Sequence, residues 1–166
     1  LARWQHPQRG AVPPDQFIPL AEECGLIDEL SRWSLGEACR QMADWRARGV
    51  AVPRVAVNVS ARTFQNPGLP ALVAELLRQH GLCPQDLTLE MTESVVMDTT
   101  AGVPATIDAV QALGVHLSLD DFGTGYSSLG YLHRLPIHEL KLDKSFVQDL
   151  VDNAAARALT NTVLRI

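Results

Sequence analysis

Two adjacent carboxylates, Asp120 and Asp121, follow the apolar stretch "HLSL" and precede a turn that contains Gly123 and Gly125. Neighbouring like charges repel each other, and a buried pair of them is costly unless a cation lies close by. A strand that served only to pack would gain nothing from such a pair at its end. The pattern therefore predicts that Asp120 and Asp121 bind a positively charged group.

Polar side chains also occur at or near the ends of three other strand-like segments. They are Asn58 in "VAVNVS", Glu90 in "LTLEMTES", and Lys141 with Asp143 in "ELKLDKS". The spacing between successive segments is close to that of one strand–helix unit. Ligands of parallel α/β folds bind at the carboxyl edge of the sheet, so we expect these groups to converge on one site.

Asn, Glu and Asp side chains offer oxygen ligands, which suit Mg²⁺ or Mn²⁺ better than Zn²⁺, an ion that prefers His and Cys. The alternative is that each polar group acts alone. A single acid at a strand end is more often a helix N-cap, a role that Asp143 fits, and Lys141 alone fits a surface lysine. The coincidence at four consecutive strands favours a metal site.

An oxygen-rich site with a lysine supports two chemistries. One is two-metal hydrolysis of a phosphodiester, in which paired ions activate a water and stabilise the leaving oxygen. The other is enolate chemistry, in which one metal lies among acids and a lysine removes a proton. The stretch "DFGTGYSS" is neither a P-loop nor a dinucleotide fingerprint, so it favours the first only weakly.

The elements that must position these groups alternate regularly along the chain. Strands are predicted at residues 54–60, 87–93, 115–121 and 138–146, and helical segments at 68–81, 100–114, 127–133 and 153–166. This alternation indicates a parallel sheet, either doubly wound or closed as a barrel.

The first 49 residues lack this alternation. Residues 1–19 are expected to be irregular because of their four prolines, and a short helix is expected at 20–25. A long helix is predicted at 26–49. Its apolar face is expected to comprise Leu26, Ile27, Leu30, Trp33, Ala38, Met42 and Trp45, with both tryptophans in the core.

The composition indicates one globular domain: the chain has 166 residues, of which 46% are hydrophobic and 20% charged. A net charge of -5 argues against long nucleic acid as a partner. Cys24, Cys39 and Cys83 have no CxxC spacing and are expected to be reduced core thiols. Reduced thiols, together with the lack of a recognisable signal peptide and of a membrane-spanning run, predict a cytoplasmic location.

Six stretches, in this order and spacing, resemble one known family. They are "LARWQHP", "FIPLAEECGLI", "VAVNVS", "LEMTES", "DDFGTGYSSLGYL" and "LKLDKSFV", and the family is the EAL domain, the bacterial cyclic di-GMP phosphodiesterase. The resemblance covers essentially the whole chain. It implies an α/β fold, a TIM-type (β/α)8 barrel of which residues 1–166 form an incomplete portion. The first strand, with the signature glutamate, and the last strands are expected outside these residues, so the chain alone is expected to be inactive.

The resemblance also implies an activity, hydrolysis of cyclic di-GMP to linear pGpG with two Mg²⁺ or Mn²⁺ ions. Asn58, Glu90 and Asp120 resemble ligands of the first ion. Asp120 would bridge to the second ion, which Asp121 also binds. Lys141 would hold and polarise the attacking water.

Three further roles follow from the resemblance. Arg3 resembles the arginine that contacts the dinucleotide. Glu93 resembles the anchor of a loop that couples metal binding to dimerisation. The residues of this active-site loop are Phe122, Gly123, Thr124, Gly125, Tyr126, Ser127 and Ser128.

The expected partners are cyclic di-GMP, a second copy of the chain, and GGDEF or sensory domains in the same parent chain. The parent is expected to be cytoplasmic, either free or as the cytoplasmic domain of a membrane-anchored protein. Two alternative functions stay open. One is a non-catalytic EAL domain that acts as a cyclic di-GMP receptor or protein-interaction module, and the other is a barrel enzyme of the enolate type.

Overall fold

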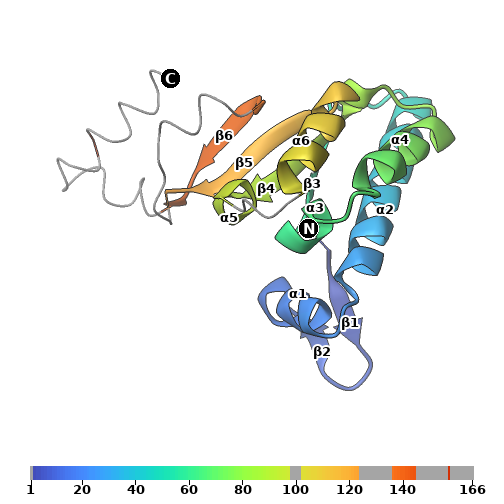
Figure 1. Cartoon of the computed structure of the whole chain (residues 1–166). Helices are drawn as coiled ribbons and strands as arrows, with labels where there is room; N and C mark the ends of the chain where they lie inside the picture. Colours follow the sequence, from blue (N-terminus) through green and yellow to red (C-terminus); the bar gives the residue numbers. More distant parts are fainter. Residues whose placement is uncertain (1, 98–101, 124–135, 145–156, 158–166) are drawn as a thin grey trace.

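A parallel sheet with helices packed on one face forms the centre of the molecule, and a small hairpin lies at its amino-terminal end (Figure 1). The computed structural model describes residues 2–97, 102–123, 136–144 and 157. The predicted helical segments at 127–133 and 153–166 fall outside this part of the chain, apart from Arg157.

The sheet contains β3 (Val55–Asn58), β4 (Leu87–Thr92), β5 (His116–Phe122) and β6 (Glu139–Leu142), in this order and all parallel. Strands that follow one another in the chain are neighbours throughout. A doubly wound sheet reverses its strand order at a switch point, whereas a barrel keeps it. The predicted α/β fold is confirmed, and the strand order is that of an incomplete TIM-type barrel.

The hydrophobic core lies between this sheet and three helices, α2 (Ile27–Ala47), α4 (Leu69–Gln79) and α6 (Val103–Ala112). Successive side chains of a strand point to opposite faces of the sheet. Leucines at alternate positions of β4 and β5 therefore enter the core, and the polar residues between them face the other way. These core residues are Leu87, Leu89, Leu117 and Leu119.

Short helices connect the longer elements, and the strand–helix alternation did not predict them. They are α3 (Ala61–Phe64), the 3₁₀ helix η1 (Pro84–Asp86) and α5 (Glu93–Met97). The helix α3 begins at an N-cap, because the Ser60 hydroxyl accepts a hydrogen bond from the Thr63 N–H at 3.2 Å.

The amino-terminal segment differs from the prediction of an irregular stretch. Residues Trp4–His6 (β1) and Gly10–Val12 (β2) form an antiparallel hairpin, and α1 spans Pro14–Glu23. The prediction of an irregular segment was wrong because it treated each proline as a break in structure. Pro14 stands at the start of α1, where its missing N–H costs nothing, and the helix continues through Pro19.

The buried stripe of α2 also differs from the predicted one. Its members follow one another at helical spacing and are Ile27, Ser31, Leu35, Cys39 and Met42. Trp33 comes two residues after Ser31, which is about 200° around a helix. The prediction of a core Trp33 is therefore wrong, and its side chain is 55% exposed. Trp45 is partly buried against the core, as predicted.

The cysteine prediction is correct for only one of the three thiols. Cys39 is buried, and burial raises the pKa of its thiol to about 11, so it stays protonated. Cys24 and Cys83 are exposed, and all three are free thiols.

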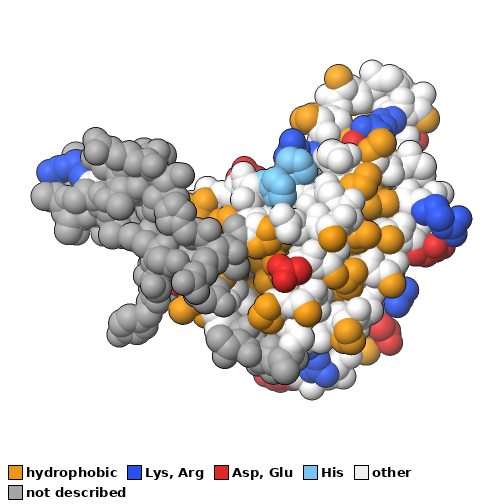
Figure 2. Space-filling model, turned by 45° about the horizontal axis from the view of Figure 1, so that its top comes forward, with side chains coloured by type: hydrophobic (Ala, Val, Ile, Leu, Met, Phe, Trp, Pro, Cys, Tyr) orange, Lys and Arg blue, Asp and Glu red, His pale blue; other side chains and the backbone are white. Residues whose placement is uncertain are grey.

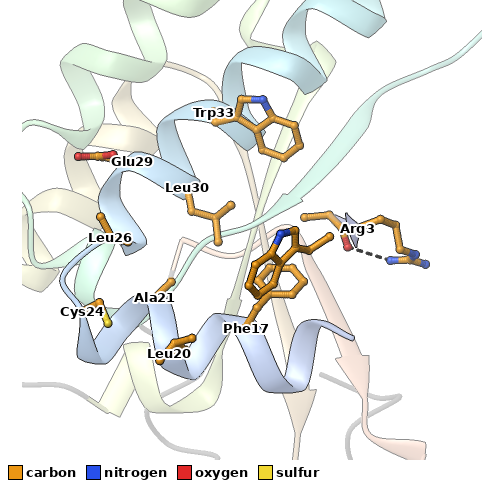
Figure 3. A pocket seen from close by; sticks show the side chains of 11 residues that line it. Arg3, Phe17, Leu20, Ala21, Cys24, Leu26, Glu29, Leu30 and Trp33 are labelled. Carbon is orange, nitrogen blue, oxygen red and sulfur yellow. Dashed lines mark hydrogen bonds between the residues drawn. The ribbon is translucent and has the colours of Figure 1, made fainter. Parts of the chain in front are cut away.

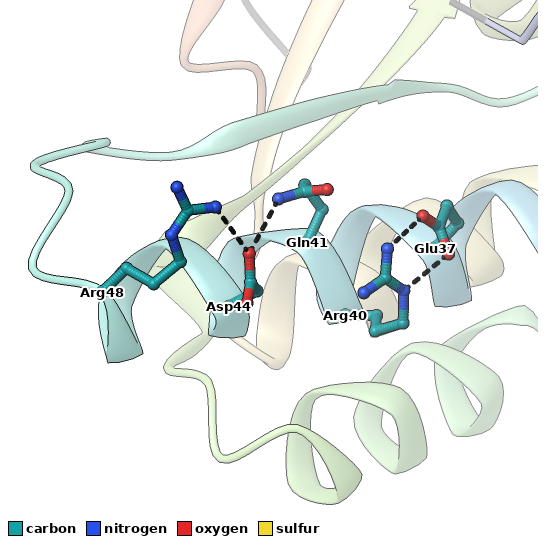
Figure 4. A network of polar contacts seen from close by, with 5 residues as sticks. All are labelled: Glu37, Arg40, Gln41, Asp44 and Arg48. Carbon is teal, nitrogen blue, oxygen red and sulfur yellow. Dashed lines mark hydrogen bonds and ion pairs between the residues drawn. The ribbon is translucent and has the colours of Figure 1, made fainter.

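The outer face of α2 carries a network of charged side chains (Figure 4). Arg40 donates to both carboxylate oxygens of Glu37, at 2.8 and 2.6 Å, and this hydrogen bonding lowers the pKa of Glu37. Gln41 and Arg48 each donate to Asp44 at 3.4 Å. Exposed pairs of this kind contribute little stability, so this face serves mainly to keep α2 solvated. Within the described part of the chain, no helix combines the length and the apolar character needed to cross a membrane.

Candidate functional site

Three of the predicted site residues meet at the carboxyl edge of the sheet. Asn58 and Glu90 are direct neighbours in the β3–β4 ladder, and the Asn58 Nδ2 donates to Glu90 Oε2 at 3.1 Å. The Lys141 ammonium from β6 forms an ion pair with Glu90 Oε1. The carboxylate of Glu90 is thus held from two directions. Strands that are distant in the sequence bring these groups together, as the strand-end pattern predicted.

The electrostatics of this cluster centre on a nearly buried carboxylate, since the Glu90 side chain is only 8% exposed. Burial alone would lower the pKa of Lys141. The hydrogen bond to Glu90 and its charge outweigh burial, with smaller contributions from Asp120 and Glu139, so the pKa of Lys141 is raised. Lys141 is therefore a cationic hydrogen-bond donor in this arrangement.

Asp120 and Asp121 lie near the end of β5, beside this cluster. Asp120 pairs with Thr92 in the β4–β5 ladder, and its Oδ1 accepts the Asp121 N–H at 3.0 Å. Asp121 is exposed and has φ 53, in the left-handed region that residues other than glycine rarely adopt. The β5–β6 register shifts between Leu119 and Phe122, so the two aspartates lie at a bulge-like irregularity just before the strand ends.

Glu93 contacts the start of the predicted active-site loop. It is 8% exposed at the beginning of α5, and its Oε2 accepts the Gly123 N–H at 3.2 Å. Gly123 has φ 99, which favours glycine. Phe122 is buried beside it, with 2% of its surface exposed. The other loop residues, Thr124, Gly125, Tyr126, Ser127 and Ser128, lie outside the described part of the chain.

Arg3 lies at a different feature, an apolar groove between β1, α1 and α2 with a volume of about 420 Å³ (Figure 3). Trp4 and Phe17 meet edge to face there, with ring centroids 6.1 Å apart, and Trp33 lines the opposite wall. The Arg3 guanidinium donates to the Ala2 carbonyl at 3.1 Å. The structure therefore places Arg3 at the edge of an aromatic groove.

The amino edge of the sheet carries a second polar cluster. Arg54 donates to His116 Nδ1 at 2.6 Å, and the His116 and His138 rings lie 4.5 Å apart. His138 Nδ1 accepts the Leu117 N–H at 3.2 Å. Figure 2 shows histidine side chains side by side at the surface, next to Lys or Arg atoms. None of these groups contacts the Glu90 cluster in the contacts that the structure describes.

This amino-edge cluster predicts a loss of stability in acid. Burial is the largest cause that lowers the pKa of His116 below 6.5, Arg54 and His138 act in the same direction, and Glu139 opposes them. The unfolded chain therefore binds a proton more readily than the folded chain. We expect the free energy of unfolding to fall as the pH drops from 7 through 6.5 towards the lowered pKa.

Urea unfolding at several pH values checks this expectation. His116→Gln should show a shallower fall of the unfolding free energy between pH 7 and pH 5.5 than the wild type. Equal slopes for the two proteins would assign the pH dependence to other groups.

The residues at the carboxyl edge fit a divalent cation by the chemistry of their donors. Asn58, Glu90, Asp120 and Asp121 offer only amide and carboxylate oxygens, which Mg²⁺ and Mn²⁺ prefer. Within the described residues, no three His, Cys, Asp or Glu side chains form a ready-made metal site. The Lys141 ammonium is the cation on Glu90 in this structure.

Two features were missed by the sequence analysis. The first is the groove, whose aromatic members Trp4, Phe17 and Trp33 come from separate elements and have no common spacing. The second is a pair of buried hydroxyls, Thr88 and Ser118, on the polar face of the sheet. Their signal was available, because they occupy the polar positions of the period-two pattern in β4 and β5.

A parallel sheet in barrel order, with amide, acid and lysine side chains at its carboxyl edge, defines a TIM-type α/β protein with a candidate metal site. The sequence matches the EAL domain family over residues 1–166. The chain therefore belongs to the EAL domain family, as its motifs predicted.

Two curated relatives illustrate the similarity. The bifunctional diguanylate cyclase/cyclic di-GMP phosphodiesterase MucR of Pseudomonas aeruginosa is 45% identical over 166 residues, which are 100% of this chain and 24% of MucR. The oxygen sensor protein DosP of Escherichia coli is 43% identical over 166 residues, which are 100% of this chain and 21% of DosP. The chain thus spans no more than 24% of the length of either relative.

A solved structure shows the same fold. The PaMucR phosphodiesterase in complex with c-di-GMP has a TM-score of 0.89 to this chain at 45% sequence identity. The match covers 98% of this chain and 66% of that one.

Proposed function

We propose that this chain is part of an enzyme that hydrolyses cyclic di-GMP to linear pGpG by a two-metal mechanism. The observation that carries the proposal is the meeting of Asn58, Glu90 and Lys141 at the carboxyl edge of the sheet, beside Asp120. Membership of the EAL family and the 45% identity to MucR supply the substrate class.

The proposed metal ligands divide between two ions. Asn58, Glu90 and Asp120 would hold the first ion, and Asp120 and Asp121 would hold the second. Bound ions of this kind activate a water and stabilise the leaving oxygen of a phosphodiester. Lys141 acts here as a donor that holds the attacking water, a role that suits its raised pKa.

Arg3 and the groove beside it are proposed to bind the dinucleotide. Arg3 offers a planar donor for phosphate or guanine oxygens. The groove has aromatic walls that suit a purine ring, and its volume of about 420 Å³ lies in the range of small-molecule pockets.

Glu93 and the loop from Phe122 to Ser128 are proposed to connect the metal site to dimerisation. The Glu93–Gly123 hydrogen bond ties the start of this loop to α5, directly after the strand that carries Glu90. We further propose that residues 1–166 belong to one EAL domain of a cytoplasmic, or cytoplasm-facing, protein. MucR and DosP suggest that cyclase or sensor domains accompany it in the same parent chain.

The experiment that tests this function uses the protein expressed from its complete gene. Purified protein is incubated with cyclic di-GMP and Mg²⁺, Mn²⁺ or Ca²⁺, and linear pGpG is followed by chromatography. We expect product with Mg²⁺ or Mn²⁺ and none with Ca²⁺. Binding of cyclic di-GMP without product would instead identify a receptor, and the absence of binding would favour the enolate-type alternative.

A further inference from the structure

Among the residues that the structure describes, two buried hydroxyl groups of the sheet have no hydrogen-bond partner. They are the Thr88 Oγ1 and the Ser118 Oγ, on residues that are 2% and 0% exposed. Burying a hydroxyl without a partner is unfavourable, and alanine or valine would avoid the cost. Two such hydroxyls in one sheet indicate that they form hydrogen bonds in a state of the protein that this structure does not describe.

Both hydroxyl-bearing residues lie on the same face of the sheet as Glu90. Thr88 is two residues before Glu90 on β4, so their side chains point to one side. The β4–β5 register sets Ser118 directly opposite Glu90, and Asn58 is opposite it on the other flank. Glu90 is therefore the middle member of a row from Asn58 to Ser118.

The carboxylate of Glu90 has hydrogen-bonding capacity left for Ser118. Its Oε2 accepts from Asn58 at 3.1 Å and its Oε1 pairs with Lys141. An ionised carboxylate has about four lone-pair sites. Carboxylates that hold a metal are commonly oriented by hydrogen bonds from neighbouring residues, whose loss typically weakens metal binding about 10–100-fold.

We propose that Ser118 is a positioning residue for Glu90. Its hydroxyl donates to the Glu90 carboxylate, directly or through one water, when that carboxylate holds a divalent cation. Thr88, two residues before Glu90 on the same face of β4, supports the same carboxylate with a smaller effect. This inference rests on the proposed function, because it requires Glu90 to be a metal ligand.

The test measures Mn²⁺ binding by calorimetry and thermal unfolding of the metal-free protein, expressed from its complete gene. Ser118→Ala should weaken Mn²⁺ binding about 10-fold. Its metal-free melting temperature should stay equal or rise, because an unpaired hydroxyl is removed. Turnover should recover at saturating Mn²⁺, with an unchanged KM for cyclic di-GMP. Thr88→Val should weaken Mn²⁺ binding less.

Thr106→Val is the matched control. Thr106 is also buried, at 4% exposed, but its hydroxyl donates at 3.0 Å to the carbonyl of Gly102, the N-cap residue of α6. This variant should lower the melting temperature and leave Mn²⁺ affinity unchanged. Equal Mn²⁺ affinity in Ser118→Ala and the wild type would overturn the inference and leave the proposed function standing. A wild type that binds no Mn²⁺ would overturn both.

Discussion

Replacing Asp120 with Asn is expected to lower metal-dependent hydrolysis of cyclic di-GMP on the order of a thousandfold. The substitution keeps the shape of the side chain and removes its negative charge, which the proposal assigns to both ions. The fold should survive, because Asp120 lies near the end of β5 and an Asn Oδ1 can still accept the Asp121 N–H. Initial rates of pGpG formation at saturating Mg²⁺ and Mn²⁺ measure the effect.

The matched control for this variant is Asp44→Asn, which removes an equal charge from the outer face of α2. Its turnover should equal that of the wild type, since the described side-chain hydrogen bonds of Asp44 go to Gln41 and Arg48 on the same helix. Full activity of Asp120→Asn would show that Asp120 is no metal ligand. Weaker Mn²⁺ binding without a change in melting temperature would support the assignment.

The sheet could be predicted from the sequence because its signal is local. Leu117 and Leu119 alternate with Ser118 and Asp120, and such alternation specifies a strand with one apolar face. The parallel arrangement followed from the helices between strands. Convergence of Asn58 and Glu90 then required no further information, since equivalent ends of parallel strands lie at one edge.

Features that depend on tertiary context could not be predicted in the same way. The hairpin of β1 and β2 is short and contains a turn that His6 stabilises by accepting the Gln8 and Arg9 N–H groups. Nothing in the local pattern separates this hairpin from an irregular loop. Trp33 was assigned to an apolar helical face that included Leu26 and Leu30, but the buried stripe of α2 runs along a different side of the helix.

The side-chain contacts within the site also depend on tertiary structure and could not be predicted from the sequence. Sequence spacing brought Lys141 and Glu90 to one edge of the sheet, but it could not show that the two side chains form an ion pair. Nor could it place Arg3, which precedes the regular alternation and lies beside a groove whose walls come from three elements. The spacing of the strands thus predicted that Asn58, Glu90 and Lys141 share one edge of the sheet, but not the contacts between their side chains.

The ion pair of Lys141 and Glu90 leads to a second large expected effect. Lys141→Met keeps most of the length of the side chain and removes its charge. We expect turnover to fall about 100- to 1,000-fold, because the attacking water loses a positioned donor. The metal-free protein should also lose about 1–2 kcal/mol of stability, a value reduced for the partial exposure of Lys141, since Glu90 keeps a nearly buried charge without its cation.

Unlike turnover and metal-free stability, the Mn²⁺ affinity of this variant should not fall. The ammonium of Lys141 and a divalent cation both interact with the Glu90 carboxylate, so removing the ammonium should leave Mn²⁺ affinity unchanged or tighter. Added Mn²⁺ should therefore restore more of the melting temperature in Lys141→Met than in the wild type. Lys144→Met, at an exposed neighbouring position, is the matched control and should change neither quantity. Weakened Mn²⁺ binding in Lys141→Met would mean that Lys141 organises the metal ligands, and would contradict its role as a donor to the attacking water alone.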